Sequence, residues 1–185
     1  MIGLVLAGGE SRRLGHDKAR LDDAALPRLA AERLAAVCAE VAVADRGRGL
    51  VPGRPSLPDA AGRGPAAGIL AGAAAYPGRP LLVLACDLPR VPAGLLAELA
   101  RCGGDWAVPR WAGGLEPLCA RYGPAALRLL AERVAAGRFD LHGLAGAGGL
   151  AVRYLEGDDL RRFGDPGEIF LNLNTPDDLE RWLQP

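Results

Sequence analysis

Leu4-Val5-Leu6-Ala7-Gly8-Gly9-Glu10-Ser11-Arg12-Arg13-Leu14-Gly15-His16-Asp17-Lys18 stands near the start of the chain, where an apolar run breaks into paired glycines and then a basic loop. The run over residues 2–7 has the length of a buried strand. The two glycines can adopt backbone angles closed to other residues, so that consecutive N–H groups can converge on an anion. Arg12, Arg13 and Lys18 add positive charge around them. The stretch therefore predicts a phosphate-binding loop after a strand.

Lys18 is the only lysine among 22 basic residues. Its ammonium group is a point charge on a flexible stem, for which the planar guanidinium of arginine is not an equivalent substitute on a phosphate. We therefore interpret Lys18 as a phosphate-binding residue. The alternative is an ordinary solvated lysine on a loop.

Length and composition indicate one domain with a single core, since the chain has 185 residues and 50% of them are hydrophobic. No run is long and apolar enough to cross a membrane, and the first residues lack the charged region of a signal peptide. The formal net charge of zero provides no general basic field for nucleic acid. We expect a cytoplasmic protein without nucleic-acid or membrane partners. The cysteines lie far apart without a Cys-x-x-Cys pair and are expected to be reduced core thiols: Cys38, Cys86, Cys102 and Cys119.

Strand and helix patterns alternate along the chain and predict an α/β domain. Helices are expected over residues 26–37, 66–76, 91–99 and 127–134 and from Thr175 onward. Further strands are expected over residues 41–44, 81–86, 106–109, 115–122, 151–155 and 169–172. Two segments rich in glycine, residues 45–63 and 143–149, are predicted to be loops, and the first is long enough to suggest a function.

Asp87 directly follows the continuous apolar run 81–86, which is typical of a parallel strand buried on both faces. Ligands of open α/β sheets bind beyond the carboxyl ends of the strands. We favour a metal-holding role for Asp87 over a turn cap, because a phosphate loop needs a divalent partner. Asn172 and Asn174 flank a predicted strand end at the same rim. Thr175 is explained by capping the last helix, but the two asparagines have no such local explanation.

Several motifs together resemble the molybdenum cofactor guanylyltransferase family, and they occur in the family's order over nearly the whole chain. They are Leu6-Ala7-Gly8-Gly9 with Ser11-Arg12-Arg13, Gly15 and Asp17-Lys18; Asp59 with Gly64-Pro65-Ala66-Ala67-Gly68-Ile69; Cys86-Asp87-Leu88-Pro89; Glu116-Pro117-Leu118; and Asn172-Leu173-Asn174-Thr175-Pro176-Asp177-Asp178-Leu179. The resemblance implies a Rossmann-like, doubly wound α/β domain with a mostly parallel sheet and helices on both faces. It also implies transfer of GMP from GTP to the terminal phosphate of molybdenum-molybdopterin, with release of pyrophosphate and dependence on Mg²⁺. Transient contact with proteins that make or deliver this cofactor follows from the same resemblance.

The resemblance also implies roles for single residues. The nucleotide-binding set is Leu6, Ala7, Gly8, Gly9, Lys18, Asp59 and Asp87. Arg12, Lys18 and Asp87 are expected to be catalytic, with Asp87 also holding the metal, and Asn172 and Asn174 to face the acceptor. Residues 1–100 would then bind the nucleotide and residues 101–185 the acceptor. The chain departs from the family where Ala44 and Asp45 replace a frequent asparagine, so a nucleotide contact there is in doubt.

The expected chemistry requires no general base, because a phosphate acceptor is already ionised at neutral pH. Catalysis would consist of positioning two polyanions and neutralising their charge. Three alternatives stay open to experiment. The chain could be a cytidylyltransferase, a nucleotidyltransferase for another phosphorylated acceptor, or a non-catalytic module that binds nucleotide and cofactor. A Rossmann dehydrogenase is disfavoured, since the first strand is not followed by Gly-x-Gly-x-x-Gly.

Overall fold

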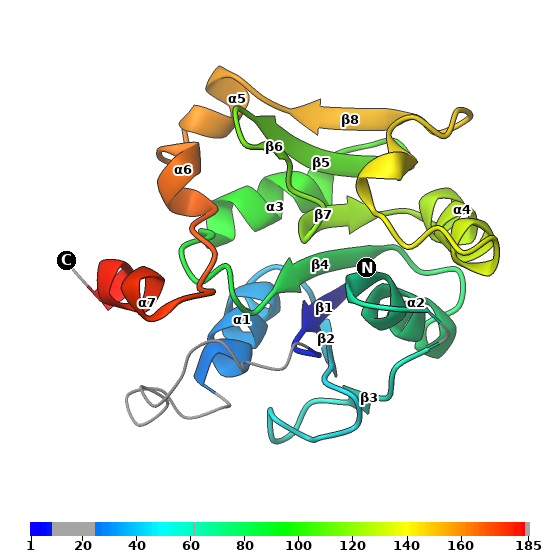
Figure 1. Ribbon diagram of the computed structural model, residues 1–185, viewed down its shortest axis with the longest axis horizontal. Helices are drawn as coiled ribbons and strands as arrows, with labels where there is room; N and C mark the ends of the chain where they lie inside the picture. Colours follow the sequence, from blue (N-terminus) through cyan, green and yellow to red (C-terminus); the bar gives the residue numbers. More distant parts are fainter. Residues whose placement is uncertain (9–24, 61, 184–185) are drawn as a thin grey trace.

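The computed structural model describes residues 1–8, 25–60 and 62–183, and within them eight strands form one mixed sheet (Figure 1). The strands are β1 (Ile2–Leu6), β2 (Glu40–Ala44), β3 (Ser56–Leu57), β4 (Leu81–Ala85), β5 (Trp106–Trp111), β6 (Gly114–Leu115), β7 (Cys119–Tyr122) and β8 (Val152–Leu155). Their order is β3-β2-β1-β4-β7-β5-β6, with β8 also paired to β5. The predicted α/β class is confirmed.

The sheet is parallel from β3 to β4, and β7 is the strand that reverses direction next to β4. In Figure 1 the arrows of β4, β5 and β8 point toward the same side, where α6 and α7 lie, and β7 points away from it. The chain passes from β1 to β2 on one side and places β4 on the other side of β1. The carboxyl ends of β1 and β4 therefore form a topological switch point, where α/β sheets bind their ligands.

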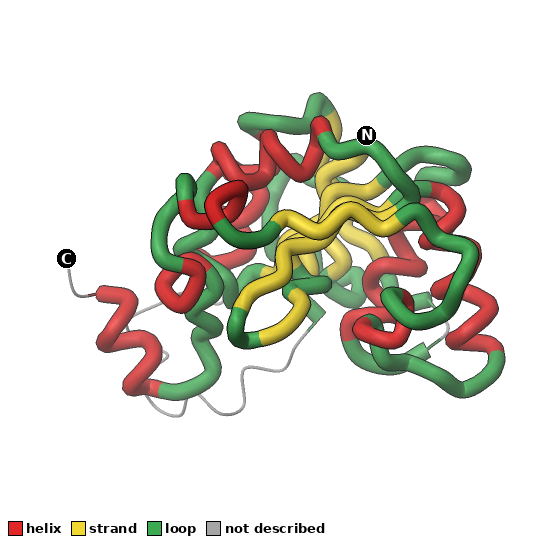
Figure 2. The backbone as a smooth tube through the Cα atoms, turned by 90° about the horizontal axis from the view of Figure 1, so that it is seen from above, coloured by secondary structure: helices red, strands yellow, loops and turns green. Residues whose placement is uncertain are grey.

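Helices cover both faces of the sheet (Figure 2). The longer helices form two pairs in contact: α1 (Ala25–Ala35) with α3 (Ala93–Arg101), and α2 (Pro65–Ala75) with α4 (Pro124–Ala135). Helix α2 lies close to the sheet because it carries glycine where a side chain would collide. A Cβ built on Gly72 would lie 2.7 Å from Cδ2 of Leu4. This arrangement confirms the doubly wound architecture.

Short elements complete the chain. They are a 3₁₀ turn η2 (His142–Leu144) and the helices α5 (Asp158–Arg161), α6 (Pro166–Ile169) and α7 (Pro176–Leu183). None of the described helices is both long enough and apolar enough to span a bilayer. The four cysteines are free thiols, as predicted, although Cys86 and Cys102 are only partly buried.

The predicted strand over residues 169–172 is wrong. Ile169 ends helix α6, and residues 171–174 form an irregular segment. The helix forms because the carboxylate of Asp165 accepts hydrogen bonds from the N–H groups of Gly167 and Glu168, with Pro166 in the first turn. These local start signals prevail over the apolar run that follows.

Three other predictions need smaller corrections. The loop over residues 45–63 contains β3, which pairs with β2, and the glycine-rich loop 143–149 begins inside η2. The predicted strand 115–122 is split by a turn at residues 116–118, where Pro117 lacks the N–H that a continuous ladder needs. Its two ends form β6 and β7.

Candidate active site

The carboxyl ends of three parallel strands meet at one edge of the sheet. Leu6 of β1 is in register with Ala44 of β2 on one side and with Ala85 of β4 on the other. The next residues stay together, because the N–H of Ala7 donates to Ala44 O (3.0 Å) and the N–H of Cys86 donates to Leu6 O (3.1 Å). The segments that begin at residues 7, 45 and 86 therefore leave the sheet side by side. We call this edge the carboxyl edge.

Gly8 faces the ion pair of Asp59 and Arg46. A Cβ on Gly8 would lie 3.8 Å from Asp59 Oδ1 and 3.7 Å from Arg46 Nε, and the two side chains are 3.0 Å apart. Gly8 does not adopt the left-handed conformation that its sequence suggested. The described chain does not itself require glycine there, whereas a ligand approaching the backbone closely would. The structure thus brings the predicted residues Gly8 and Asp59 together.

Two arginines that the sequence reasoning missed lie beside this backbone. Arg46 pairs with Asp59, and the guanidinium of Arg48 donates to the carbonyl oxygen of Ala7 and to that of Asp45 (2.8 Å). Both follow β2 directly, within the loop that was predicted to be functional. Two basic residues shortly after a predicted strand end were the signal in the sequence that could have identified them. They add positive charge at the carboxyl edge.

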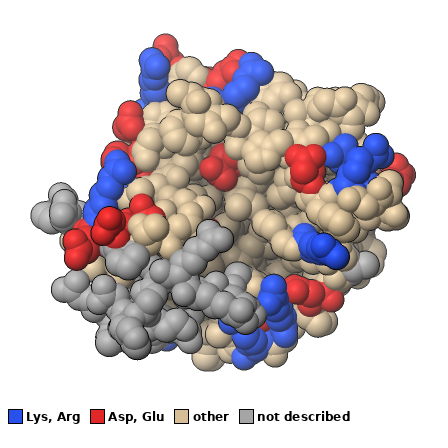
Figure 3. Space-filling view, viewed as in Figure 1, with Lys and Arg blue, Asp and Glu red and all other residues tan. Residues whose placement is uncertain are grey.

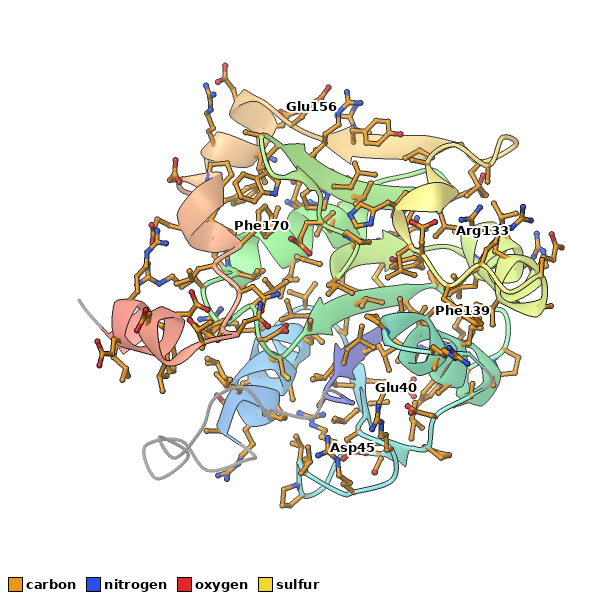
Figure 4. The ribbon with its side chains drawn as sticks, in the orientation of Figure 1. Glu40, Asp45, Arg133, Phe139, Glu156 and Phe170 are labelled. Atoms are coloured by element: carbon orange, nitrogen blue, oxygen red, sulfur yellow. The ribbon has the colours of Figure 1, made fainter. Side chains whose placement is uncertain are left out.

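Asp45, which follows β2 (Figure 4), is fully buried. Its Oδ2 accepts the N–H of Leu50 (2.8 Å), and its Oδ1 accepts the hydroxyl of Ser56. Arg46 has a positive φ of 61°, which lets the chain turn sharply after the strand. Asp45 therefore orders its own loop.

Asp87 and Asn172 meet at the carboxyl edge, as the sequence predicted. The N–H of Leu173 donates to Asp87 O (2.9 Å), which fixes the segment that carries Asn172. Burial raises the pKa of the Asp87 carboxyl, and a side-chain hydrogen bond from Asn172 partly offsets this rise. Asn174 is exposed, and its N–H donates to Asp178 Oδ2 (3.0 Å). Only the first of the two asparagines is thus shown beside Asp87.

The oxygens at this point fit a hard divalent cation. Asp87 Oδ1 and Asn172 Oδ1 are both shielded from solvent and have no hydrogen-bond partner among the described residues. Carboxylate and amide oxygens are typical ligands of Mg²⁺, which usually uses one or two carboxylates and takes its other ligands from water and phosphate. No group of three His, Cys, Asp or Glu side chains in the described ranges could hold a metal. A cation here would therefore take part of its ligands from Asp87 and Asn172 and part from a bound nucleotide.

Glu116 is an acidic residue of this region for which the sequence motifs indicated no role. It lies in the turn between β6 and β7, and burial, together with the nearby charge of Asp87, raises its pKa to about 7. On the face shown in Figure 3, basic and acidic side chains lie mostly around the outline, and most of the centre is uncharged. Glu116 and Asp87 are thus two carboxyl groups close together in a partly buried place.

Three residues of the predicted site, and the neighbouring Arg13, lie outside the described residues: Gly9, Arg12 and Lys18. Their roles stay predictions.

Comparison with known proteins identifies the family of this chain. Residues 3–143 match the family described as MobA-like NTP transferase domain. The chain belongs to this family. The match begins in β1 and includes the phosphate-loop motif, Asp59, Asp87 and Glu116. It ends before Asn172.

Relatives extend the likeness over nearly the full chain. A probable molybdenum cofactor guanylyltransferase of Pelotomaculum thermopropionicum is 37% identical, covering 96% of this chain and 89% of its own length. A molybdenum cofactor guanylyltransferase of Cereibacter sphaeroides is 38% identical, covering 98% of this chain and 94% of its own. The family resemblance seen in the sequence motifs is therefore confirmed, including the part that follows residue 143.

Solved structures agree on the fold. Molybdopterin-guanine dinucleotide biosynthesis protein A from Archaeoglobus fulgidus superposes with a TM-score of 0.79 at 27% identity, covering 98% of this chain and 96% of that one. A 2-C-methyl-D-erythritol 4-phosphate cytidylyltransferase from Thermus thermophilus shares the fold at 19% identity, with a TM-score of 0.64 and coverage of 96% and 95%. Since proteins named for different bases share this architecture, the fold alone does not select the base.

Proposed function

We propose that this protein transfers GMP from GTP to the terminal phosphate of molybdenum-molybdopterin and releases pyrophosphate, with Mg²⁺ as the divalent cation. The observation that carries the proposal is the proximity of Asp87 and Asn172 at the carboxyl edge. They lie next to the end of β1, where the predicted phosphate-binding loop (the glycine loop) begins. The near full-length similarity to proteins named molybdenum cofactor guanylyltransferase supports this choice of reaction. The site and the family thus indicate the same chemistry.

The two halves of the chain have separate tasks in this proposal. Residues 1–100 bind the nucleotide, which is supported by the closeness of Gly8 to Asp59. Residues 101–185 bind the acceptor and reach the nucleotide through Asn172, with Asn174 further along the same segment. The two substrates then meet above Asp87, between β1 and β4.

Charge neutralisation and positioning are the work of the site. The acceptor phosphate is ionised before it binds, so no side chain has to remove a proton from it. Arg46 and Arg48 add positive charge beside the backbone of residues 7–8, and Arg12 and Lys18 are proposed to contact the phosphates from the glycine loop. Mg²⁺, held by Asp87 and Asn172, would supply further neutralisation of the phosphate charges. The reaction would take place in the cytoplasm, and the product would pass on through transient contact with cofactor-synthesis or delivery proteins.

Pyrophosphate release tests the proposal directly. The purified protein is incubated with molybdenum-molybdopterin, Mg²⁺ and either GTP or CTP. We expect release with GTP and little with CTP, and loss of about a hundredfold or more in Asp87→Asn, which is typical of removing one transition-state contact. Asp159→Asn is the matched control, because Asp159 is an exposed partner of Arg153.

Each alternative predicts a different result. A preference for CTP indicates a cytidylyltransferase. Release of pyrophosphate only with another phosphorylated acceptor, such as a sugar phosphate, indicates a different nucleotidyltransferase. Binding of GTP without any release indicates a non-catalytic module. Near wild-type transfer by Asp87→Asn contradicts the role of this carboxylate.

A further inference from the structure

Glu116 is brought beside Asp87 by the pairing of β4 with β7. This antiparallel pairing includes Leu84 opposite Cys119. The N–H of Ala85 continues it by donating to Leu118 O (2.8 Å). Both chains leave the ladder here at the carboxyl edge, with Asp87 two residues after Ala85 and Glu116 two residues before Leu118. The charge of Asp87 contributes to the raised pKa of the Glu116 carboxyl, in agreement with this placement.

The backbone around Glu116 is held in place by several hydrogen bonds. Its N–H donates to Pro109 O (3.0 Å), and its carbonyl oxygen accepts the N–H of Cys119 (3.1 Å). The hydroxyl of the buried Tyr122 donates to Pro117 O (2.8 Å). Glu116 is therefore presented on a turn that two strands fix, which is the kind of support that a binding residue needs.

A local structural role does not fully explain why a glutamate stands at position 116. The Glu116 carboxylate accepts the N–H of Leu118, which stabilises the turn. A neutral glutamine would accept the same hydrogen bond without placing a second negative charge next to Asp87. Two carboxylates at close range repel each other unless a cation lies between them. The unpartnered oxygens of Asp87 and Asn172 lie at the same edge.

We propose that Glu116 is the second carboxylate of the divalent-cation site and holds, together with Asp87, the Mg²⁺ that accompanies the nucleotide. This inference rests on the proposed function. With two carboxylates, the Asn172 oxygen and the phosphates of the nucleotide, the site has the mixture of ligands that Mg²⁺ commonly takes.

Mn²⁺ is the probe, since electron paramagnetic resonance measures the free ion directly. The Kd for Mn²⁺ is measured for wild type, Asp87→Asn, Glu116→Gln and Glu116→Asp, each with and without GTP. The matched control is Glu40→Gln, because Glu40 is exposed at the amino end of β2 (Figure 4) and pairs with Arg79. We expect the Kd to rise about tenfold or more in Glu116→Gln, to rise less in Glu116→Asp, which keeps the charge, and to stay unchanged in Glu40→Gln.

The outcomes separate this inference from the proposed function. If Glu116→Gln and Glu116→Asp bind Mn²⁺ as wild type does while Asp87→Asn does not, Glu116 is only a turn residue and the proposed function stands. Equal losses in the Gln and Asp variants also overturn the inference, because charge would then not matter. If wild type binds no Mn²⁺ with GTP and releases no pyrophosphate, both proposals fail. Thermal unfolding without metal verifies that each variant is folded.

Discussion

The Asn172 side chain hydrogen-bonds the carboxylate of Asp87, so a residue near the end of the chain touches the residue that follows the central strand β4. A hydrogen bond of this kind favours the charged form of the carboxyl and opposes the effect of burial. The two residues therefore act as a unit, and the effect of substituting both should differ from the sum of the two single effects.

Asn172→Ala tests this unit. We expect the turnover of GTP to fall about tenfold to a hundredfold, because Asp87 loses its hydrogen bond and the site loses an oxygen. The pKa of Asp87 should rise further, so the activity profile should shift to higher pH. Asn174→Ala is the control, since Asn174 is exposed, and it should affect the acceptor KM more than the pH profile. Identical pH profiles for wild type and Asn172→Ala would show that the bond does not influence Asp87.

Asp59→Asn tests the nucleotide side. The ion pair with Arg46 is partly exposed on both sides, so its loss should change the free energy of unfolding by less than about 1 kcal/mol. GTP affinity should nevertheless fall about tenfold, because the pair lies over Gly8. Calorimetric titration with GTP measures this. Glu40→Gln breaks a comparable exposed pair with Arg79 at the opposite edge of the sheet and should leave GTP affinity unchanged; a loss of similar size there would make the Asp59 effect non-specific.

Glu116→Gln should change the pH dependence of stability in the metal-free protein. In the folded state the pKa of Glu116 is about 7, against an ordinary value of 4.5. Between these values the folded chain holds more protons than the unfolded chain, so stability falls as pH rises from about 4.5 to 7 and then levels off. At 1.36 kcal/mol per pKa unit, the shift from 4.5 to about 7 makes the variant more stable than wild type at pH 8 by about 3 kcal/mol. Urea unfolding at pH 5 and pH 8 measures the difference, and an equal effect of the substitution at both values would contradict it.

Gly104→Ala should weaken the sheet where β5 meets β8. Gly104 has φ of 88°, and a Cβ there would lie 2.6 Å from Ala151 O, a backbone atom that cannot easily move. We expect a loss of about 1–3 kcal/mol in the free energy of unfolding. Its neighbour provides the control, because a Cβ on Gly103 would meet no atom within 4 Å. Gly103→Ala should stay within about 0.5 kcal/mol of wild type in the same denaturation experiment.

Much of the fold is predictable from the sequence, because buried parallel strands are continuous apolar runs. Leu81–Ala85 is such a run and is found as β4. The strand predicted over residues 169–172 is wrong because the apolar run there follows the helix cap Asp165. Part of the run therefore belongs to helix α6. Short elements such as β3 carry too few residues to show a period.

The candidate site, too, is only partly predictable from the sequence. Asp87 is predictable, because a carboxylate after a buried strand has a known position at the sheet edge. Glu116 is not, since its place depends on β7 running antiparallel to β4, which no local pattern reveals. Asp45 illustrates a third case. It also follows a strand, but its carboxylate is used by Leu50 and Ser56 within its own loop.

The reversal of β7 has a consequence for how substrate preference could diverge in such proteins. Because this strand starts where its neighbours finish, the hairpin segment over residues 112–118 lies at the carboxyl edge, although it belongs to the second half of the chain. On the proposed function, exchanging that hairpin would alter the surroundings of the acceptor phosphate, while the parallel strands assigned to the nucleotide keep their order. Changes of acceptor can therefore accumulate in one short hairpin without rebuilding the rest of the domain.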